Sequence, residues 1–544
     1  MHIPKVCFVL LLFCISCNSS TDVDTIVHNG VVYTVDKNFS TVQAFAVDDG
    51  KIVATGTNEE ILENYNGKEK VDVGGRAVYP GFIDAHAHFL GYGQSLFAVD
   101  LFGTRSWEEA VKRVQKFASE HPEEAWIVGR GWDQNKWPGK AFANNDRLNE
   151  LFPDKPVFLT RVDGHAAMAN QKALDLAGIK PGQKLTGGEI ETKGGKLTGL
   201  LIDNAKGLVG SRQPAATIND YVKWLTAAQN NCFAVGLTTV TDCGLMYNDV
   251  EAIDGLQKEG KIDMRMYIML SDDPANYDKY LAKGPYKTER MFVKGFKVYA
   301  DGALGSRGAC LLQPYADRHD SYGFLLRTKA HYDSVAQLLA PTAFQMCTHA
   351  IGDSANREIL NIYNRVLNGA NDKRWRIEHA QVINWNDFSL FSKSTIVPSV
   401  QPTHATSDMY WAQERVGPER ITGAYAYKQL LMQNGWLPLG TDFPVEDIST
   451  FKTFFAAVAR KDDKGFPAKG FQPENALTRE QALRGMTIWA ARAGFLEKEC
   501  GSIEKGKNAD FTILSNDLMK VPEDRILQTK AVSTYLAGKK VFGK

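Results

Sequence analysis

Two histidines separated by a single residue, His86 and His88, stand at the end of an apolar run that begins at Val78. Alternate residues of a β-strand face the same side, so both imidazoles can reach one metal ion. The pair alone is only moderately specific, because two structural histidines inside a core would show the same spacing. The other histidines of the chain decide between these two interpretations.

Three more residues with metal-binding side chains stand in a similar setting. His349, His379 and Asp442 each end an apolar run of strand length. A barrel of parallel strands brings such residues together, because the ends of its strands surround one site. Four neutral imidazoles would leave two divalent ions with almost no compensating charge, so anionic and bridging ligands are also needed. Asp442 supplies one anion.

Lys297 lies inside a further apolar run, between Phe296 and Val298. A lysine in such a position is rarely buried unless it is paired. Desolvation lowers the pKa of an amine, and a neutral amine can add carbon dioxide to give a carbamate, which is a bridging anion. The alternative is an ordinary lysine paired with Asp301, and the residues taken alone favour that alternative.

Eight apolar runs, separated by stretches that could form helices, predict the elements that position these residues. This βα rhythm is typical of a parallel sheet buried on both faces. We expect a (β/α)8 TIM barrel, with a doubly wound sheet as the alternative. The runs are 78–89, 236–243, 264–270, 296–300, 344–349, 375–379, 395–401 and 437–442.

The remaining segments predict two additions to the barrel, which itself would occupy 79–500. Residues 101–214 fall between the first two runs, exceed the length of a loop and hold strand-like pieces. We expect them to form an inserted region that caps the barrel mouth. Short strands separated by turn residues occupy 25–78 and return at 501–544. The two chain ends should pair into a composite β-sandwich.

Five motifs in this order resemble the amidohydrolase superfamily, specifically its amidohydrolase-3 branch, which includes proteins like N-substituted formamide deformylase. The resemblance extends from about residue 24 to the C-terminus. The motifs are PGFIDAHAH at 80–88, KVYADGALGSR at 297–307, THAIGD at 348–353, RIEHA at 376–380 and GTDFP at 440–444. The fold expected from the apolar runs agrees with this family.

The resemblance implies a centre of two divalent metal ions whose ligands are all present in this sequence. One ion is held by His86, His88 and Asp442, the other by His349 and His379, and a carboxylated Lys297 and a hydroxide bridge them. Zinc is expected first, although manganese, iron and nickel accept similar ligands. The implied reaction is hydrolysis of a non-peptide carbon–nitrogen bond, of the amide or N-formyl type, in a small molecule. Asp442 would carry the proton from the hydroxide to the leaving nitrogen.

Two further histidines are candidates for catalysis. His165 lies in the inserted region and His404 follows the seventh run, and both could donate to the substrate carbonyl oxygen. A structural role is a serious alternative for each. Weaker candidates for the pocket wall, for which surface or core roles are equally compatible, are Trp132, Asp163 and Arg307.

Two other functions are compatible with this pattern. The same site could serve an esterase or a deacetylase. A lipid-anchored binding protein that contains metal but performs no turnover is a further alternative, because a fold does not determine a function. The presence of Asp442 argues against a protein that only binds its ligand, because binding without turnover does not need a base beside a metal-bound water.

Composition excludes several partners. The 63 basic and 63 acidic residues give a formal net charge of +0, so the chain lacks the basic field that nucleic acid or an anionic membrane surface requires. Hydrophobic residues make up 44% of the chain, which predicts a sizeable folded core. We expect a small-molecule substrate, no nucleic-acid partner, and a homodimer as an assembly that the sequence permits.

The N-terminus predicts export. Lys5 precedes an apolar run over 6–15 that is too short to span a bilayer and has the layout of a signal peptide. Residues 1–17 end like a bacterial lipobox, which would place a lipid on Cys17 and leave 18–24 as a tether, although Cys14 departs from the usual pattern. A plain signal peptide is the alternative. We expect a cell-envelope lipoprotein, periplasmic or on the outer face, attached to the membrane only through that lipid.

Overall fold

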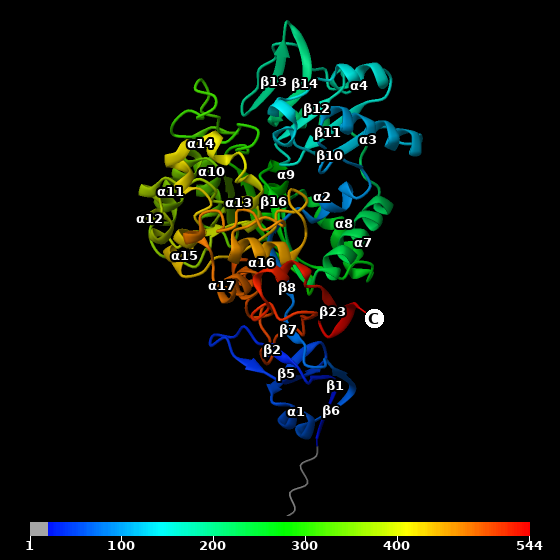
Figure 1. The fold of residues 1–544 in the computed structure, drawn as a ribbon, viewed down its shortest axis with the longest axis vertical. Helices are drawn as coiled ribbons and strands as arrows, with labels where there is room; N and C mark the ends of the chain where they lie inside the picture. The colour runs from blue at the N-terminus through cyan, green and yellow to red at the C-terminus, as the bar shows by residue number, and fades with distance from the viewer. Residues whose placement is uncertain (1–19, 544) are drawn as a thin grey trace, which may run out of the picture.

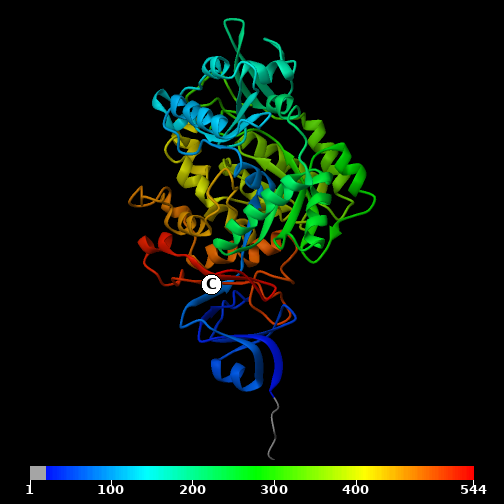
Figure 2. The ribbon, with the colours of Figure 1, turned by 90° about the vertical axis from the view of Figure 1, so that its right-hand side faces the viewer.

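A computed structural model describes residues 20–543, so the expected signal peptide and Cys17 lie outside the described part of the chain. Three bodies follow one another along the long axis of the molecule (Figures 1 and 2). The sheets formed by the chain ends lie at one extremity, the barrel occupies the middle, and the inserted region lies at the opposite extremity.

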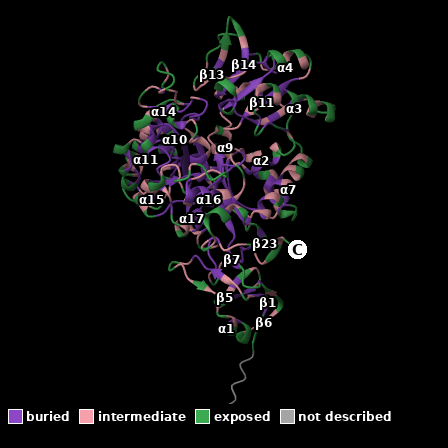
Figure 3. Ribbon diagram, in the orientation of Figure 1, coloured by how far each residue is buried: buried purple, intermediate pink, exposed green. Residues whose placement is uncertain are grey.

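The barrel is built from seven consecutive parallel strands. In spatial order they are β8 (Phe82–Ala87), β15 (Leu237–Leu245), β16 (Arg265–Ser271), β18 (Met291–Tyr299), β19 (Gln345–Ala350), β20 (Arg376–His379) and β21 (Val397–Ser399). Every residue of β8 and of β19 is buried, as expected for strands covered on both faces. Figure 3 shows this concentration of buried residues in the middle of the molecule.

The eighth predicted run, 437–442, nearly closes the ring without forming a regular strand. On one side the Gly440 backbone N–H donates to the Val400 carbonyl oxygen at 3.0 Å. On the other side Ala85 N–H donates to the Leu439 carbonyl oxygen at 3.2 Å, and Asp442 N–H to that of His86 at 2.8 Å. The chain therefore forms an α/β TIM-like barrel rather than a doubly wound sheet.

Amphipathic helices cover the outside of the barrel strands. Examples are α7 (Ile218–Ala234), α8 (Tyr247–Lys258), α10 (Lys329–Leu339) and α11 (Asp353–Leu367). In α11 the side chains of Ile359, Leu360 and Tyr363 are buried, which is the spacing of a single helix face. This helix starts directly after β19, so the end of β19 and its histidine lie at the helix N-terminus.

The inserted region forms a six-stranded sheet of its own, which begins slightly earlier than predicted. Its strands are β9 (Val99–Asp100), β10 (Ile127–Trp132), β11 (Val157–Arg161), β12 (Ala166–Ala169), β13 (Gly188–Lys193) and β14 (Lys196–Asp203). Helix α3 (Trp107–Glu120) packs on this sheet and buries Val111 and Val114. The region thus has a separate hydrophobic core, which explains its strand-like sequence.

Two sheets contain the strands of the chain ends. The first is β5 (Lys51–Gly56), β4 (Ala44–Asp48), β1 (Thr21–His28) and β6 (Tyr65–Asp72). The second is β24 (Lys539–Phe542), β23 (Ala531–Leu536), β22 (Phe511–Leu514), β7 (Ala77–Pro80), β2 (Val31–Tyr33) and β3 (Thr41–Val42). Strand β22 runs antiparallel to β7, so the two ends of the chain meet in one sheet.

Two boundaries differ from those predicted. Strand β1 starts at Thr21, so residues 21–24 of the expected tether belong to a sheet, because they pair with β6. Strand β7 continues to Pro80, past the expected boundary at residue 78. Among residues 20–543, no helix combines the length and the apolar character needed to cross a bilayer.

Candidate metal centre

The strand-end residues singled out in the sequence meet at one cavity. Lys297 from β18, His349 from β19 and His379 from β20 line it together with His88 and Asp442. His86 lies directly beneath and is fully buried. The predicted ligand residues therefore converge, although they are spread over more than three hundred positions of the chain.

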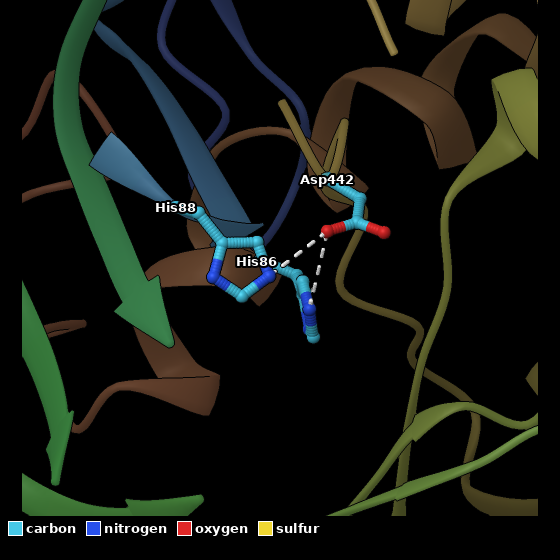
Figure 4. A group of neighbouring side chains, drawn as sticks. All are labelled: His86, His88 and Asp442. Atoms are coloured by element: carbon cyan, nitrogen blue, oxygen red, sulfur yellow. Dashed lines mark ion pairs between the residues drawn. The ribbon is translucent and has the colours of Figure 1, made fainter. Parts of the chain in front are cut away.

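Asp442 lies close to two imidazoles, that of His86 in β8 and that of His88 just after the end of this strand. Its Oδ1 atom is 3.3 Å from His88 Nε2 and 3.6 Å from His86 Nε2 (Figure 4). Its backbone adopts a positive φ of 64° and donates a hydrogen bond to His86, which fixes the carboxylate against the strand. Oδ1 is buried and has no hydrogen-bond partner among the described residues.

The remaining two strand-end histidines lie on the other side of the cluster. The ring of His379 is 4.7 Å from that of His86 and 4.6 Å from that of His349, measured between centroids. His349 Nε2 is buried without a hydrogen-bond partner, and the nearest carboxylate oxygen, Oδ1 of Asp301, is 3.8 Å away. Buried polar atoms without partners are rare and call for an explanation.

These atoms fit a divalent metal ion. Burial, followed by the charge of Lys297, lowers the pKa of His86 to about 4, so the imidazole is neutral and free to act as a ligand. Two overlapping groups of three bring ligand atoms within 4.8 Å of one another: His86, His88 and Asp442, and His379, His404 and Asp442. A metal ion would also provide a partner for Asp442 Oδ1 and His349 Nε2, two buried atoms that make no hydrogen bond within the described residues.

Lys297 is buried, with Nζ 3.2 Å from His86 Nε2. Its burial opposes the charged form, yet the acidic groups around it, Tyr299 and Cys243 first, raise its pKa above the ordinary value. A neutral amine at Lys297 therefore requires more than its burial. The alternative pairing is also absent, because within residues 20–543 Lys297 makes no ion pair and Asp301 accepts backbone hydrogen bonds instead.

Several residues that support the cluster were not among the predicted site residues, although Arg376 and Glu378 stand in the motif at 376–380. Glu378 Oε2 lies 2.5 Å from His86 Nδ1, and Gln401 Oε1 lies 2.7 Å from His379 Nδ1. Arg376 Nε lies 2.6 Å from Glu378 Oε1 inside the barrel. Partners of this kind orient metal-binding histidines and select their tautomers. One sequence signal could have identified Arg376 and Glu378. They are charged residues at alternate positions of a buried strand, so they must find partners within the core.

Both candidate catalytic histidines face the cavity. His404 Nε2 lies 3.1 Å from Asp442 Oδ2, and its Nδ1 lies 3.2 Å from Glu446 Oε1. Burial alone would lower the pKa of His404, but the bonds to these two carboxylates raise it to about 10. His165 Nδ1 lies 2.6 Å from Asp203 Oδ1. Its ring lies 4.9 Å from that of His349.

Comparison with known proteins now assigns the chain to a family. The family described as "Amidohydrolase family" matches residues 69–542. This chain belongs to the amidohydrolase family. The resemblance proposed from five motifs is thereby confirmed.

Two relatives and one solved structure match this amidohydrolase over nearly its whole length. It is 32% identical to protein LONG AFTER FAR-RED 3 of Arabidopsis thaliana, covering 95% of this chain and 91% of that protein. It is 26% identical to N-substituted formamide deformylase of Arthrobacter pascens, covering 95% and 97%. A metal-dependent hydrolase of Pyrococcus horikoshii superposes with a TM-score of 0.76 at 29% identity, covering 92% and 99%.

The cavity wall of this amidohydrolase differs in part from the predicted one. Asp163 lines the cavity, where it pairs with Arg161 at 2.6 Å. Trp132 does not, because it is buried in the core of the inserted region and donates from Nε1 to the Leu159 carbonyl oxygen. Arg307 turns away to pair with Asp317 at 2.8 Å. The assignments of Trp132 and Arg307 to the wall are therefore corrected.

Proposed function

We propose that this amidohydrolase is a metal-dependent hydrolase that cleaves a non-peptide carbon–nitrogen bond, of the amide or N-formyl type, in a small molecule. The observation that carries the proposal is the convergence of strand-end histidines on Asp442, which leaves Asp442 Oδ1 and His349 Nε2 buried without hydrogen-bond partners among the described residues. The names of two relatives support it, since one is a formamide deformylase and the other a metal-dependent hydrolase.

We assign the candidate ligands to two metal ions according to the side of the cluster on which each residue lies. His86, His88 and Asp442 would hold one ion, and His349 and His379 the other, with zinc as the expected metal. A carbamate on Lys297 would bridge them. Divalent ions beside Lys297 would favour its neutral amine by charge repulsion, and that amine can add carbon dioxide. When bound, the ions polarise the scissile carbonyl and lower the pKa of the attacking water.

The protein's own residues then have distinct tasks. Asp442 accepts the proton of the attacking water and delivers it to the leaving nitrogen. His165 and His404 both face the cavity. His165 donates from Nε2 to the carbonyl oxygen of the substrate as negative charge develops there, and His404 does the same once its Nε2 leaves Asp442 Oδ2, which lies 3.1 Å away. We further propose that residues 101–214 cap the mouth and exclude bulk water, and that the two sheets of the chain ends act as one β-sandwich.

A substrate panel tests the reaction type. Purified protein is incubated with N-formyl compounds, N-acyl compounds and esters of the same acids, with added zinc and with or without bicarbonate. Hydrolysis of an amide or formamide that falls in His349→Ala but not in the control His121→Ala, whose side chain is 45% exposed and does not line the cavity, is the expected result. Turnover of esters alone would replace the proposal with an esterase. Stoichiometric binding of metal without any turnover would favour a binding protein.

A further inference from the structure

Asp203 lies where the inserted region meets the barrel. It ends β14 and precedes α6 (Asn204–Gly210), with a φ of 50° and a ψ of −121°. This is a strained backbone conformation for any residue other than glycine. Its side chain is completely buried, yet Oδ2 has no hydrogen-bond partner among the described residues. Strain and an unpartnered carboxylate oxygen at one residue indicate a task beyond folding.

Within the inserted region, Asp203 holds His165 at two points. Its Oδ1 atom accepts from His165 Nδ1 at 2.6 Å, and its backbone N–H donates to the His165 carbonyl oxygen at 2.8 Å. The imidazole held in this way lies 4.9 Å from the ring of His349 and 6.4 Å from that of Tyr299. With Nδ1 bound to the carboxylate, Nε2 is the ring atom left free for the cavity.

On the barrel side, the same carboxylate packs against two glycines of the loop after β18. A Cβ atom on Gly302 would lie 2.3 Å from Asp203 Oδ2, and one on Gly308 would lie 2.5 Å from it. Neither glycine has a positive φ, so both are needed for the space they leave rather than for their backbone conformation. The next residue, Asn204, donates from Nδ2 to the carbonyl oxygen of Leu326 at 3.0 Å.

A third glycine of this loop is covered in the same way. A Cβ atom on Gly305 would lie 3.2 Å from Nη1 of Arg161, which also belongs to the inserted region. Side chains of the inserted region therefore pack directly against the backbone of the glycines in the segment 302–308. These glycines belong to the motif KVYADGALGSR or directly follow it, and the same motif begins with Lys297.

We propose that Asp203 is a positioning residue that docks the inserted region on the glycines of 302–308 and holds His165 above His349. The effect on turnover rests on the proposed function, whereas the docking does not. A carboxylate on Nδ1 also fixes the orientation of the ring and directs Nε2 toward the cavity. The inserted region and the catalytic cluster would then assemble as one unit.

Single substitutions test the contact from both sides. Asp203→Asn keeps the shape of the side chain but removes its charge. Gly302→Ala adds a methyl group that displaces the Asp203 carboxylate from its position against Gly302 and Gly308. Each should lower kcat by about 10- to 100-fold with little change in KM, because a donor is displaced by a fraction of an ångström or more. Each should also accelerate limited proteolysis within residues 101–214. Gly207→Ala in α6 is the matched control, since its Cβ would meet open space.

A double substitution separates docking from general damage. In an Asp203→Ala background the methyl group of Gly302→Ala meets no carboxylate, so it should add little to the effect on proteolysis or kcat. Equal damage by Gly302→Ala in both backgrounds would overturn the proposal, as would an Asp203→Asn protein that is cleaved and turns over like the wild type. If the wild type hydrolyses nothing, the proposed function fails and the proteolysis cycle still tests the docking.

Discussion

Glu378 holds His86 from inside the barrel, with 2.5 Å between Oε2 and Nδ1. The contact directs His86 Nε2 toward the cluster, where Lys297 Nζ and Asp442 Oδ1 lie 3.2 and 3.6 Å from it. Arg376 completes the arrangement, with Nε 2.6 Å from Glu378 Oε1 and Nη2 donating to Glu378 Oε2 at 3.0 Å. A charge-paired carboxylate behind a histidine raises its basicity as a ligand and fixes its ring.

Replacing Glu378 with Gln should weaken metal binding by about 10- to 100-fold, because the His86 ring loses a charged partner. It should also destabilise the fold, since Arg376 would be left as a buried charge without its partner. Competition against a chelating dye measures the first effect and thermal unfolding the second. Glu414→Gln, in an exposed ion pair, is the control. Unchanged metal affinity would show that Glu378 serves the fold alone.

Replacing Asp442 with Asn should abolish turnover while leaving measurable bound metal. The amide retains an oxygen that can act as a ligand, but it cannot accept the proton of the attacking water. Steady-state kinetics and metal analysis on the same preparation measure both quantities. Asp447→Asn, at the cavity rim, controls for loss of charge near the site. Retained activity in Asp442→Asn would refute the role of this residue as proton carrier.

The convergence of the candidate ligands could be predicted because they stand in motifs within or at the end of apolar runs, and the barrel could be predicted from those runs. The supporting contacts could not, because Glu378 and His86 are 292 positions apart and meet only through strand order. Trp132 was misplaced because an aromatic residue in an apolar strand can face either a cavity or a core. The pKa of Lys297 depends on charges from several strands, which no local pattern contains.

The two chain ends should separate in alkaline solution. Tyr33 and Tyr79 both donate to Asp517 at 2.9 Å, and burial followed by this carboxylate raises the pKa of each phenol above its ordinary value. An unfolded tyrosine ionises near pH 10. The raised folded values therefore contribute stability that is complete below about pH 10 and is lost as the pH rises further.

Thermal unfolding between pH 8 and 11 should accordingly show a steep loss of stability in the wild type. Tyr79→Phe removes one of the two ionising groups, so its loss over this range should be smaller, although it starts from a lower stability at neutral pH. Tyr322→Phe, at a half-exposed position, should behave like the wild type. Parallel curves for Tyr79→Phe and the wild type would exclude this pair as the alkali-sensitive contact.

The N-terminal lipid is a separate prediction, since Cys17 lies outside the described residues. Cells that express the full chain should incorporate labelled palmitate into the wild type and not into Cys17→Ser. Cys500→Ser, which alters a buried free thiol, controls for the loss of a cysteine. Equal labelling of the wild type and Cys17→Ser would leave only a plain signal peptide or an uncleaved segment.

The most direct test of a metal-dependent hydrolase at this site is its metal content, because every step of the proposed hydrolysis depends on the cluster around Asp442. The measurement is the ratio of divalent metal to folded chain in protein purified without chelator, by inductively coupled plasma mass spectrometry. We expect two ions per chain in the wild type and a reduced ratio in both His86→Ala and His379→Ala. Fewer than one ion per folded wild-type chain, with no gain on addition of zinc and bicarbonate, would contradict this expectation.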